Sequence, residues 1–244
     1  METLEKTTVG ELVAKDFRTV TLFSKYGIDF CCSGNITLEA ICEENKLNTN
    51  DLLNQIETIL NTETNSKVDF NAWPIDLLAE YIEKKHHHYV AQKTKILLPF
   101  LNQICDVHSE KHSELLEIKE LFTNCSEEMA EHIQTEETVL FPYIKNLVNA
   151  LIVDELIMRP NFETVENPIE LLMAEHIAES IRFKEIANLS NNFTPPADAC
   201  STYKVTFDLL KEFQQDMAKH IFLENNILFP KAIQLEKDYA SQFS

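Results

Sequence analysis

Residues that interrupt helices are scarce in this chain. Only three glycines and eight prolines occur among its 244 residues, and there is one tryptophan. Leucine, glutamate and lysine, which extend helices readily, are plentiful. The composition therefore predicts an all-α protein, and 244 residues are enough to bury a core in one or two domains.

Positive charge is also in short supply. Lysine and arginine together number 21 against 40 aspartates and glutamates, which gives a net charge of −19 and an isoelectric point near 4.8. A chain this acidic repels phosphate backbones, so nucleic acid is not expected as a partner. The acidic residues are spread along the chain, and most of them are expected to cover solvated helix faces.

Long apolar runs are missing as well. No run reaches the roughly 18 residues that a membrane-spanning helix needs, and the stretch METLEKTTVGELVAKDF lacks the apolar segment of a secretory signal. Six cysteines are too sparse for a disulfide scaffold in a chain of this length. We therefore expect a cytoplasmic protein with free thiols and no membrane segment.

Apolar spacing divides the chain into two units of different size. Residues 1–62 are expected to form a small domain of four short helices, and residues 63–72 a polar linker. Residues 73–244 carry four long amphipathic patterns with short joins, which is typical of an antiparallel four-helix bundle. Pro142 is expected to kink or end the second of these long helices.

One short sequence occurs twice in the bundle. HIQTEETVLFP begins at His132 and HIFLENNILFP begins at His220, and both follow the pattern H-x-x-x-E-x-x-x-L-F-P. A further histidine lies on the preceding helix, His87 in the first half and His176 in the second, at separations of 45 and 44 residues. This spacing indicates a duplicated helix pair with two-fold pseudo-symmetry.

The repeated residues have the spacing of metal ligands. A separation of four places His132 and Glu136 on one helix face, one turn apart, and the same holds for His220 and Glu224. A buried carboxylate without a partner is costly, so two of them beside four histidines need a cation. Two histidines per ion and two shared carboxylates give each of two ions four protein ligands. This donor set fits iron or manganese and leaves room for an oxygen bridge and an open position.

A single H-x-x-x-E motif is weak evidence, because it is more often a surface pair than a metal site. Two copies with the same continuation and the same upstream histidine favour a metal site. The remaining alternative is a duplicated structural unit that has lost its metal.

These segments resemble a known family. HIQTEETVLFP, LMAEHIAES and HIFLENNILFPKA are similar to the hemerythrin-like domain of the iron–sulfur cluster repair di-iron proteins, also called repair-of-iron-centres proteins. YGIDFCCSGNITLEAI is similar to their small N-terminal cysteine-pair domain. The resemblance covers nearly the whole chain in one order. It implies a hemerythrin-like four-helix bundle, two non-haem iron ions, and a role in repairing iron–sulfur clusters under nitrosative or oxidative stress.

Carried over by position, the family's iron ligands fall on His87, His132, Glu136, His176, His220 and Glu224. The resemblance implies that the two glutamates bridge two oxygen-bridged iron ions. The first histidine lies in the run HHHYV, so His86 and His88 stay open as alternatives to His87. Only one of three consecutive helical residues is expected to face the core.

Other polar residues near the motifs have two interpretations. Glu131, Glu137 and Glu175 flank the proposed ligands, and they are expected either to hydrogen-bond to them or to lie on solvated positions. His108 and His112 share a helix face but lack a matching partner set, so a structural or surface role is favoured.

The adjacent cysteines Cys31 and Cys32 are the second candidate site. Adjacent cysteines do not readily bind one metal, and a disulfide between them needs a strained turn. One interpretation is a half-buried thiol pair in a tight turn; the other is a reactive pair whose pKa the following helix lowers. The resemblance implies a role in iron handover or redox coupling. Cys105, Cys125 and Cys200, in contrast, are expected to be buried small apolar residues.

The leading functional hypothesis is a di-iron protein that repairs damaged iron–sulfur proteins, with small gases such as NO and O2 as ligands of the open iron position. Alternatives are a hemerythrin-like sensor or carrier of O2 or NO, and a di-iron reductase of nitric oxide or peroxide. The cysteine domain favours repair, because a simple carrier has no use for it. The sequence leaves open whether the protein is an enzyme and whether it is a monomer or a homodimer.

Overall fold

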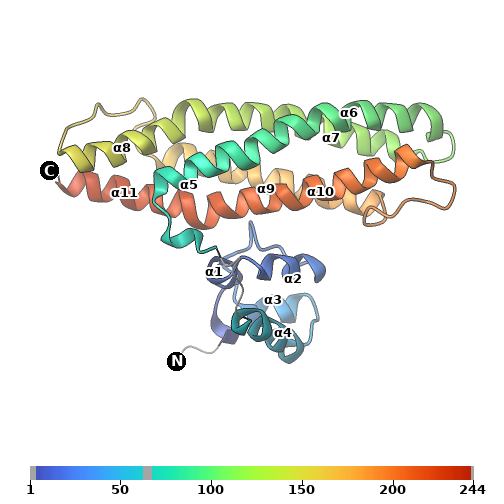
Figure 1. Cartoon of the computed structure of the whole chain (residues 1–244), viewed down its shortest axis with the longest axis horizontal. Coiled ribbons are helices and arrows are strands. Elements are labelled where there is room, and N and C mark those ends of the chain that lie inside the picture. The colour runs from blue at the N-terminus through green and yellow to red at the C-terminus, as the bar shows by residue number, and fades with distance from the viewer. Residues whose placement is uncertain (1–3, 63–67, 243–244) are drawn as a thin grey trace.

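The computed structural model describes residues 4–62 and 68–242, and in this part of the chain the named elements are all helical. The all-α prediction is therefore confirmed. Figure 1 shows a long bundle of helices with a small helical domain packed against its side. Within the described residues, no helix is long and apolar enough to cross a membrane.

The small domain contains four short α-helices: α1 Val9–Lys15, α2 Thr19–Lys25, α3 Leu38–Glu44 and α4 Thr49–Asn61. Thr8 and Glu11 form a capping box that starts α1, and the Thr37 hydroxyl caps α3 by accepting from the backbone of Ala40. Thr8 and Thr37 also pair in an isolated β-bridge, so the two helix starts lie side by side. The loop between α2 and α3 projects from this domain toward the bundle (Figure 1).

The bundle consists of four long helical rods. One is uninterrupted, and each of the other three is two α-helices joined by a single π-helical turn. The first three are α5 Ile75–Ile82 with η3 Glu83–His87 and α6 His88–His108; α7 Glu114–Thr135 with η4 Glu136–Leu140 and α8 Phe141–Val153; and the uninterrupted α9 Glu166–Leu189. The fourth is α10 Ser201–Leu223 with η5 Glu224–Leu228 and α11 Phe229–Gln242.

The π-turns lie at the positions of the repeated motif. η3 ends at His87, η4 begins at Glu136 and η5 begins at Glu224. In η4 the backbone N–H of Phe141 bonds to the carbonyl of Glu136, five residues back, and Pro142 follows without ending the rod. Pro142 therefore does not end its helix: a widened turn before the proline absorbs the lost backbone hydrogen bond.

The small domain and the bundle share apolar packing. Phe222 of α10 is fully buried, and its ring lies 5.9 Å from Phe17 and 6.1 Å from Phe30 of the small domain. Phe70 lies in η2 Phe70–Ala72, within the predicted linker, and packs between Phe17 and Trp73 at centroid distances of 5.3 and 5.0 Å. Of the predicted linker 63–72, residues 63–67 lie outside the described residues, and the segment after them is a packed connection. The boundaries 1–62 and 73–244 remain predictions.

Candidate metal centre

The six proposed ligands meet at the centre of the bundle in two groups that share both glutamates. One group is His87, Glu136, His220 and Glu224; the other is His132, Glu136, His176 and Glu224. In each group, one ligand atom of every residue lies within 4.8 Å of the others. All six side chains are at most 3% exposed. The duplicated helix pair therefore builds two buried donor sets, one on each side of the paired carboxylates.

The nitrogen atoms that face the centre are all Nε2. In the first group, Nε2 of His87 and Nε2 of His220 lie 3.1 Å apart, and Nε2 of His220 lies 2.8 Å from Oε1 of Glu224. Nε2 of His87 also lies 3.2 Å from Oε2 of Glu136. Donor atoms that share one octahedral ion at about 2.1 Å lie about 3 Å apart, so this group has the size of a coordination site.

The second group repeats this geometry. Nε2 of His132 and Nε2 of His176 lie 3.1 Å apart. Nε2 of His132 is 3.4 Å from Oε2 of Glu136, and Nε2 of His176 is 3.2 Å from Oε2 of Glu224. Each carboxylate thus reaches both groups, as a residue that bridges two ions must.

The hydrogen-bonding state of the carboxylates fits a cation. Both side-chain oxygens of Glu136 and Oε2 of Glu224 are buried without a hydrogen-bond partner. A buried carboxylate oxygen with no donor is strongly disfavoured, whereas a metal ion between the groups would compensate its charge. This observation speaks against a duplicated unit that has lost its metal.

The carboxylates also change the protonation of the imidazoles. Burial alone would lower the pKa of His87, but the nearby negative carboxylates of Glu136 and Glu224 outweigh it and raise the pKa to about 10. At His132, burial again lowers the pKa, but the Glu136 carboxylate outweighs it and raises the pKa to about 9. Burial prevails at His220 and lowers its pKa to about 4. Without metal, protons on His87 and His132 would therefore take the place of the cations.

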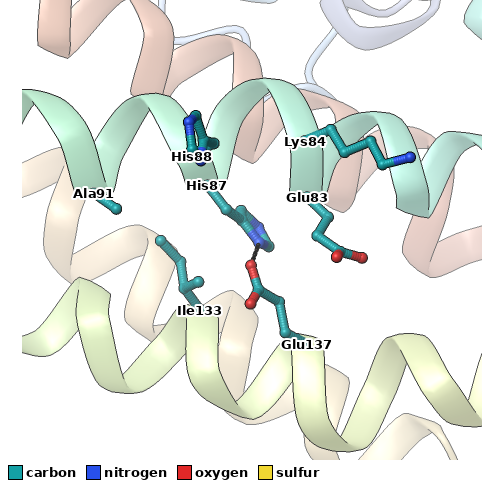
Figure 2. Close-up of a pocket in the computed structure, with 7 residues that line it drawn as sticks. All are labelled: Glu83, Lys84, His87, His88, Ala91, Ile133 and Glu137. Carbon is teal, nitrogen blue, oxygen red and sulfur yellow. Dashed lines mark hydrogen bonds and ion pairs between the residues drawn. The ribbon is translucent and has the colours of Figure 1, made fainter.

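Two glutamates beside proposed ligands hydrogen-bond to Nδ1 of an imidazole, the ring nitrogen that faces away from the centre. Oε1 of Glu137 lies 2.9 Å from Nδ1 of His87, and Figure 2 shows the two side chains pointing at each other from facing helices. Oε2 of Glu175 lies 2.7 Å from Nδ1 of His132. Of the two interpretations of these glutamates, the hydrogen-bonded one is found. Such partners fix the ring orientation and make the inward Nε2 a better metal ligand.

The residues that hydrogen-bond to Nδ1 of the proposed ligands occupy equivalent positions in the two repeats. One of them, Asn225, was not predicted from the sequence. Asn225 directly follows Glu224, as Glu137 follows Glu136, and its Oδ1 accepts from Nδ1 of His176 at 2.8 Å. The repeat alignment EETVL with ENNIL contained this signal. The position equivalent to Glu175 is His86, which offers no carboxylate to His220. Nδ1 of His220 accordingly has no hydrogen-bond partner among the described residues.

Of the three consecutive histidines, His87 is the one whose nitrogen reaches the carboxylates. His88 is exposed, whereas His86 is buried, bonds to Asp216 at 3.0 Å and stacks on His220 with ring centroids 5.9 Å apart. The expectation that only one of the three faces the interior is therefore wrong. The rod packs against α7 on one side and α10 on the other, so residues about 100° apart can both be buried.

A surface pocket opens on the outer side of His87. It lies between the first two rods and is lined by Glu83, Lys84, His87, His88, Ala91, Ile133 and Glu137. In Figure 2 the pair formed by His87 and Glu137 lies between the two helices that border it. The pocket therefore reaches the side of His87 that faces away from the carboxylates.

Comparisons with known proteins agree with this architecture. The family profile described as the hemerythrin HHE cation binding domain matches residues 79–232, and the ScdA_N profile, a domain of unknown function (DUF542), matches residues 5–60. The iron-sulfur cluster repair protein YtfE of Yersinia pestis is 31% identical over 229 residues, which cover 93% of this chain and 97% of that protein. The iron-sulfur cluster repair protein ScdA of Staphylococcus haemolyticus is 26% identical over 223 residues, 91% of this chain and 96% of that protein.

The chain belongs to the ScdA/YtfE family of hemerythrin HHE proteins. The resemblance seen in the sequence is thereby confirmed, and so is the hemerythrin-like helical bundle with a small N-terminal domain.

The ScdA_N domain of this family member places its cysteine pair against the bundle. Sγ of Cys31 and Sγ of Cys32 are 3.9 Å apart. Sγ of Cys32 lies 3.2 Å from the Ser180 hydroxyl and 3.7 Å from the carbonyl oxygen of His176, both on α9. The hydrogen bond between the thiols lowers the pKa of Cys32 against the effect of burial, and the same bond together with burial raises the pKa of Cys31 well above its ordinary value. The pair is half-buried, and the pKa of Cys32 is lowered by its neighbouring thiol, not by the following helix as expected.

The remaining cysteines differ from one another. Cys105 and Cys125 are buried, as expected, but Cys200 is exposed, and the expectation for it is wrong. Its sulfur caps α10 by accepting from the backbone of Tyr203, and a residue at a helix start in a surface turn remains open to solvent. Nε2 of His108 lies 3.2 Å from this sulfur.

Proposed function

We propose that this protein is a non-haem di-iron protein that repairs iron–sulfur clusters damaged by nitrosative or oxidative stress. The observation that carries the proposal is the pair of buried donor sets that share Glu136 and Glu224, whose carboxylate oxygens include three without a hydrogen bond. Relatives that match nearly the whole chain are named iron–sulfur cluster repair proteins, which supports the same conclusion.

The proposed ligands divide between two iron ions. His87 and His220 would bind one ion, His132 and His176 the other, and Glu136 and Glu224 would bridge them together with an oxygen atom. Two iron ions held in this way supply one-electron redox chemistry and an open coordination position for NO or O2. Two imidazole nitrogens and two shared carboxylates per ion, with no thiolate, fit iron or manganese better than metals that prefer thiolate ligands.

The rest of the site prepares the ligands. Glu137, Glu175 and Asn225 each orient one imidazole through its Nδ1, so that Nε2 faces the centre. The surrounding bundle excludes water from the carboxylates, which strengthens their attraction for cations. The site is therefore built before metal enters, and its selectivity is a matter of donor type and of the space between the two carboxylates.

We propose that its partners are damaged iron–sulfur proteins and that it works in the cytoplasm, which the six free thiols support. The cysteine pair would take part in the handover of iron or electrons, because its sulfurs contact the helix that carries His176. The alternative of a hemerythrin-like NO or O2 sensor uses the same metal centre but gives the cysteines no task.

Reactivation of an iron–sulfur enzyme whose cluster has been damaged by nitric oxide tests the proposal. We expect reactivation by the iron-loaded protein, none after removal of iron with a chelator, and recovery after iron is restored. The Glu224→Leu variant should be inactive. Glu131→Leu, at an exposed position directly before the first repeat, should act like the wild type. Tight NO binding without any reactivation would favour the sensor alternative.

A further inference from the structure

A third group of metal-binding side chains lies outside the two buried donor sets. Asp29, Cys31 and Cys32 each offer a ligand atom, and these three atoms all lie within 4.8 Å of one another. Oδ1 of Asp29 lies 3.1 Å from Sγ of Cys31. Asp29 is exposed and Cys32 is partly exposed, so this group can be reached from solvent, unlike the buried pair.

The distance between the two sulfurs suits a shared ion. Thiolates bound to one tetrahedral ion at about 2.3 Å lie about 3.8 Å apart. Sγ of Cys31 and Sγ of Cys32 are 3.9 Å apart. The expectation that adjacent cysteines do not readily bind one metal therefore does not hold for this loop, because its backbone turns both side chains to the same side.

Several hydrogen bonds hold the loop in this shape. Oδ1 of Asp29 accepts from the backbone N–H groups of Cys31 and Cys32 at 3.1 and 3.0 Å. The side-chain amides of Asn225 and Asn226 both donate to the carbonyl of Cys31, at 3.3 and 3.1 Å. The three donor atoms are thus arranged before any ion arrives, which lowers the entropic cost of binding.

The close contact depends on a residue without a side chain. A Cβ added at Gly34 would lie 2.2 Å from Oδ1 of Asn226, so a larger residue here would displace the Asn226 side chain that holds the cysteine loop. The same approach brings Sγ of Cys32 to 3.2 Å from the Ser180 hydroxyl, which is a fourth potential donor at the site and its second oxygen. It also places the sulfur 3.7 Å from the backbone carbonyl of His176, a proposed ligand of the buried pair.

We propose that Asp29, Cys31 and Cys32 form a third metal site, which binds one divalent transition-metal ion at the surface next to the buried pair. Its role as a way-station for iron rests on the proposed function; its capacity to bind metal does not. Binding of Fe(II) releases the two thiol protons and leaves the oxidation state unchanged. Transfer to a client exchanges these two thiolates for the client's own, and the protons return to Cys31 and Cys32.

Cobalt(II) titration of the iron-loaded protein, without oxygen and with a thiol-free reductant, tests the site. Thiolate-bound cobalt(II) gives a charge-transfer band in the near ultraviolet, whereas the buried donor sets contain no sulfur and give none. We expect one equivalent of cobalt to develop the band. Cys32→Ser and the double variant Cys31→Ser/Cys32→Ser should abolish it while retaining iron, which shows that the bundle remains folded.

Two further variants sharpen the result. Asp29→Asn keeps an Oδ1 that accepts the loop hydrogen bonds but loses the charge, so the affinity for cobalt should fall at least about tenfold, the loss that even outer partners of metal sites cause. Cys200→Ser removes the other exposed thiol, which lies beside His108, and should leave the band unchanged.

A wild-type protein without the band, or a band that survives in the cysteine double variant, would overturn the third site. Cluster reactivation measured on the same preparations separates this inference from the proposed function. Cobalt binding without reactivation leaves the site standing and removes the repair role. Reactivation without any thiolate band does the reverse.

Discussion

The side chain of Asn225 accepts a hydrogen bond from Nδ1 of His176 at 2.8 Å, and its amide nitrogen donates to the carbonyl of Cys31 at 3.3 Å. One residue therefore joins the candidate metal centre to the cysteine loop. Glu137 supports His87 at the equivalent position of the other repeat, where no cysteine loop is present to be held.

Changing Asn225 should affect both sites, and changing its neighbour only one. Asn225→Ala should lower iron affinity about 10- to 100-fold, because His176 loses the partner that orients its ring. Asn226→Ala removes a hydrogen bond to Cys31 but none to a proposed ligand, so iron affinity should remain within about twofold. Competition with a chromophoric chelator measures both constants. Equal losses in the two variants would mean that Asn225 acts only through the loop.

Loss of one of the proposed bridging glutamates should weaken both metal positions. Glu136→Leu or Glu224→Leu should reduce iron from two ions to at most one per chain and remove the spectrum of the bridged pair, because each carboxylate reaches both donor sets. Elemental analysis and the visible spectrum measure this. Glu131→Leu is the matched control. A variant with full iron and an unchanged spectrum would refute the bridging assignment.

The three consecutive histidines should respond differently to alanine. His87→Ala should lose iron, since Nε2 of His87 faces the carboxylates. His88→Ala should keep it, because His88 is exposed and its ring bonds to Gln92 on the same helix. His86→Ala should keep both ions but lower stability by about 1–3 kcal/mol, because the buried Asp216 contact and the stacking on His220 are lost. Iron content and thermal melts of the three variants decide this.

The metal-free protein should be most stable near pH 6.5. The folded pKa values of His87, about 10, and His132, about 9, lie above the unfolded value of 6.5, so their contribution is present below pH 6.5 and is lost as pH rises through 9 to 10. The folded pKa of His220, about 4, lies below 6.5, so stability is lost as pH falls from 6.5 to 4.

Iron should remove the alkaline part of this dependence, because the ions replace the protons on His87 and His132. Metal binding at pH 7 should therefore release protons, and iron affinity should increase with pH up to about 9 to 10. Calorimetry in buffers of different ionisation enthalpy counts the released protons. A metal-free protein whose stability is constant between pH 7 and 10 would contradict the proposed protonation of these two histidines.

The shared apolar packing should make the bundle depend on the small domain. Phe17→Ala should lower the free energy of unfolding by about 1–3 kcal/mol, because Phe17 is partly buried between Phe222 and Phe70. If the two units were independent, only the small domain would unfold earlier. A single cooperative transition at a lower temperature, followed by circular dichroism and by iron release, would show that they unfold together.

The helical class, the bundle and the meeting of the six proposed ligands could be predicted from the sequence. The physical reason is local: a separation of four residues puts His132 and Glu136, or His220 and Glu224, on one helix face whatever surrounds them. The repeat also predicts which helices lie opposite each other. When two copies of one helix pair bury the same face, these faces meet in the core. The spacing of the repeat favoured His87 within its run but left His86 and His88 open.

Tertiary packing alone decided the rest. His86 is buried because α10 covers a side of the rod that the helical period alone would leave exposed. The π-turns η4 and η5 likewise precede Pro142 and Pro230, and the i, i+4 spacing of the motif does not predict them. The approach of the Cys31 loop to α9 depends on Gly34 meeting Asn226, residues 192 positions apart in the chain. Contacts of this kind join segments that are far apart in the chain. Helical periodicity describes only residues close in sequence, so it does not predict these contacts.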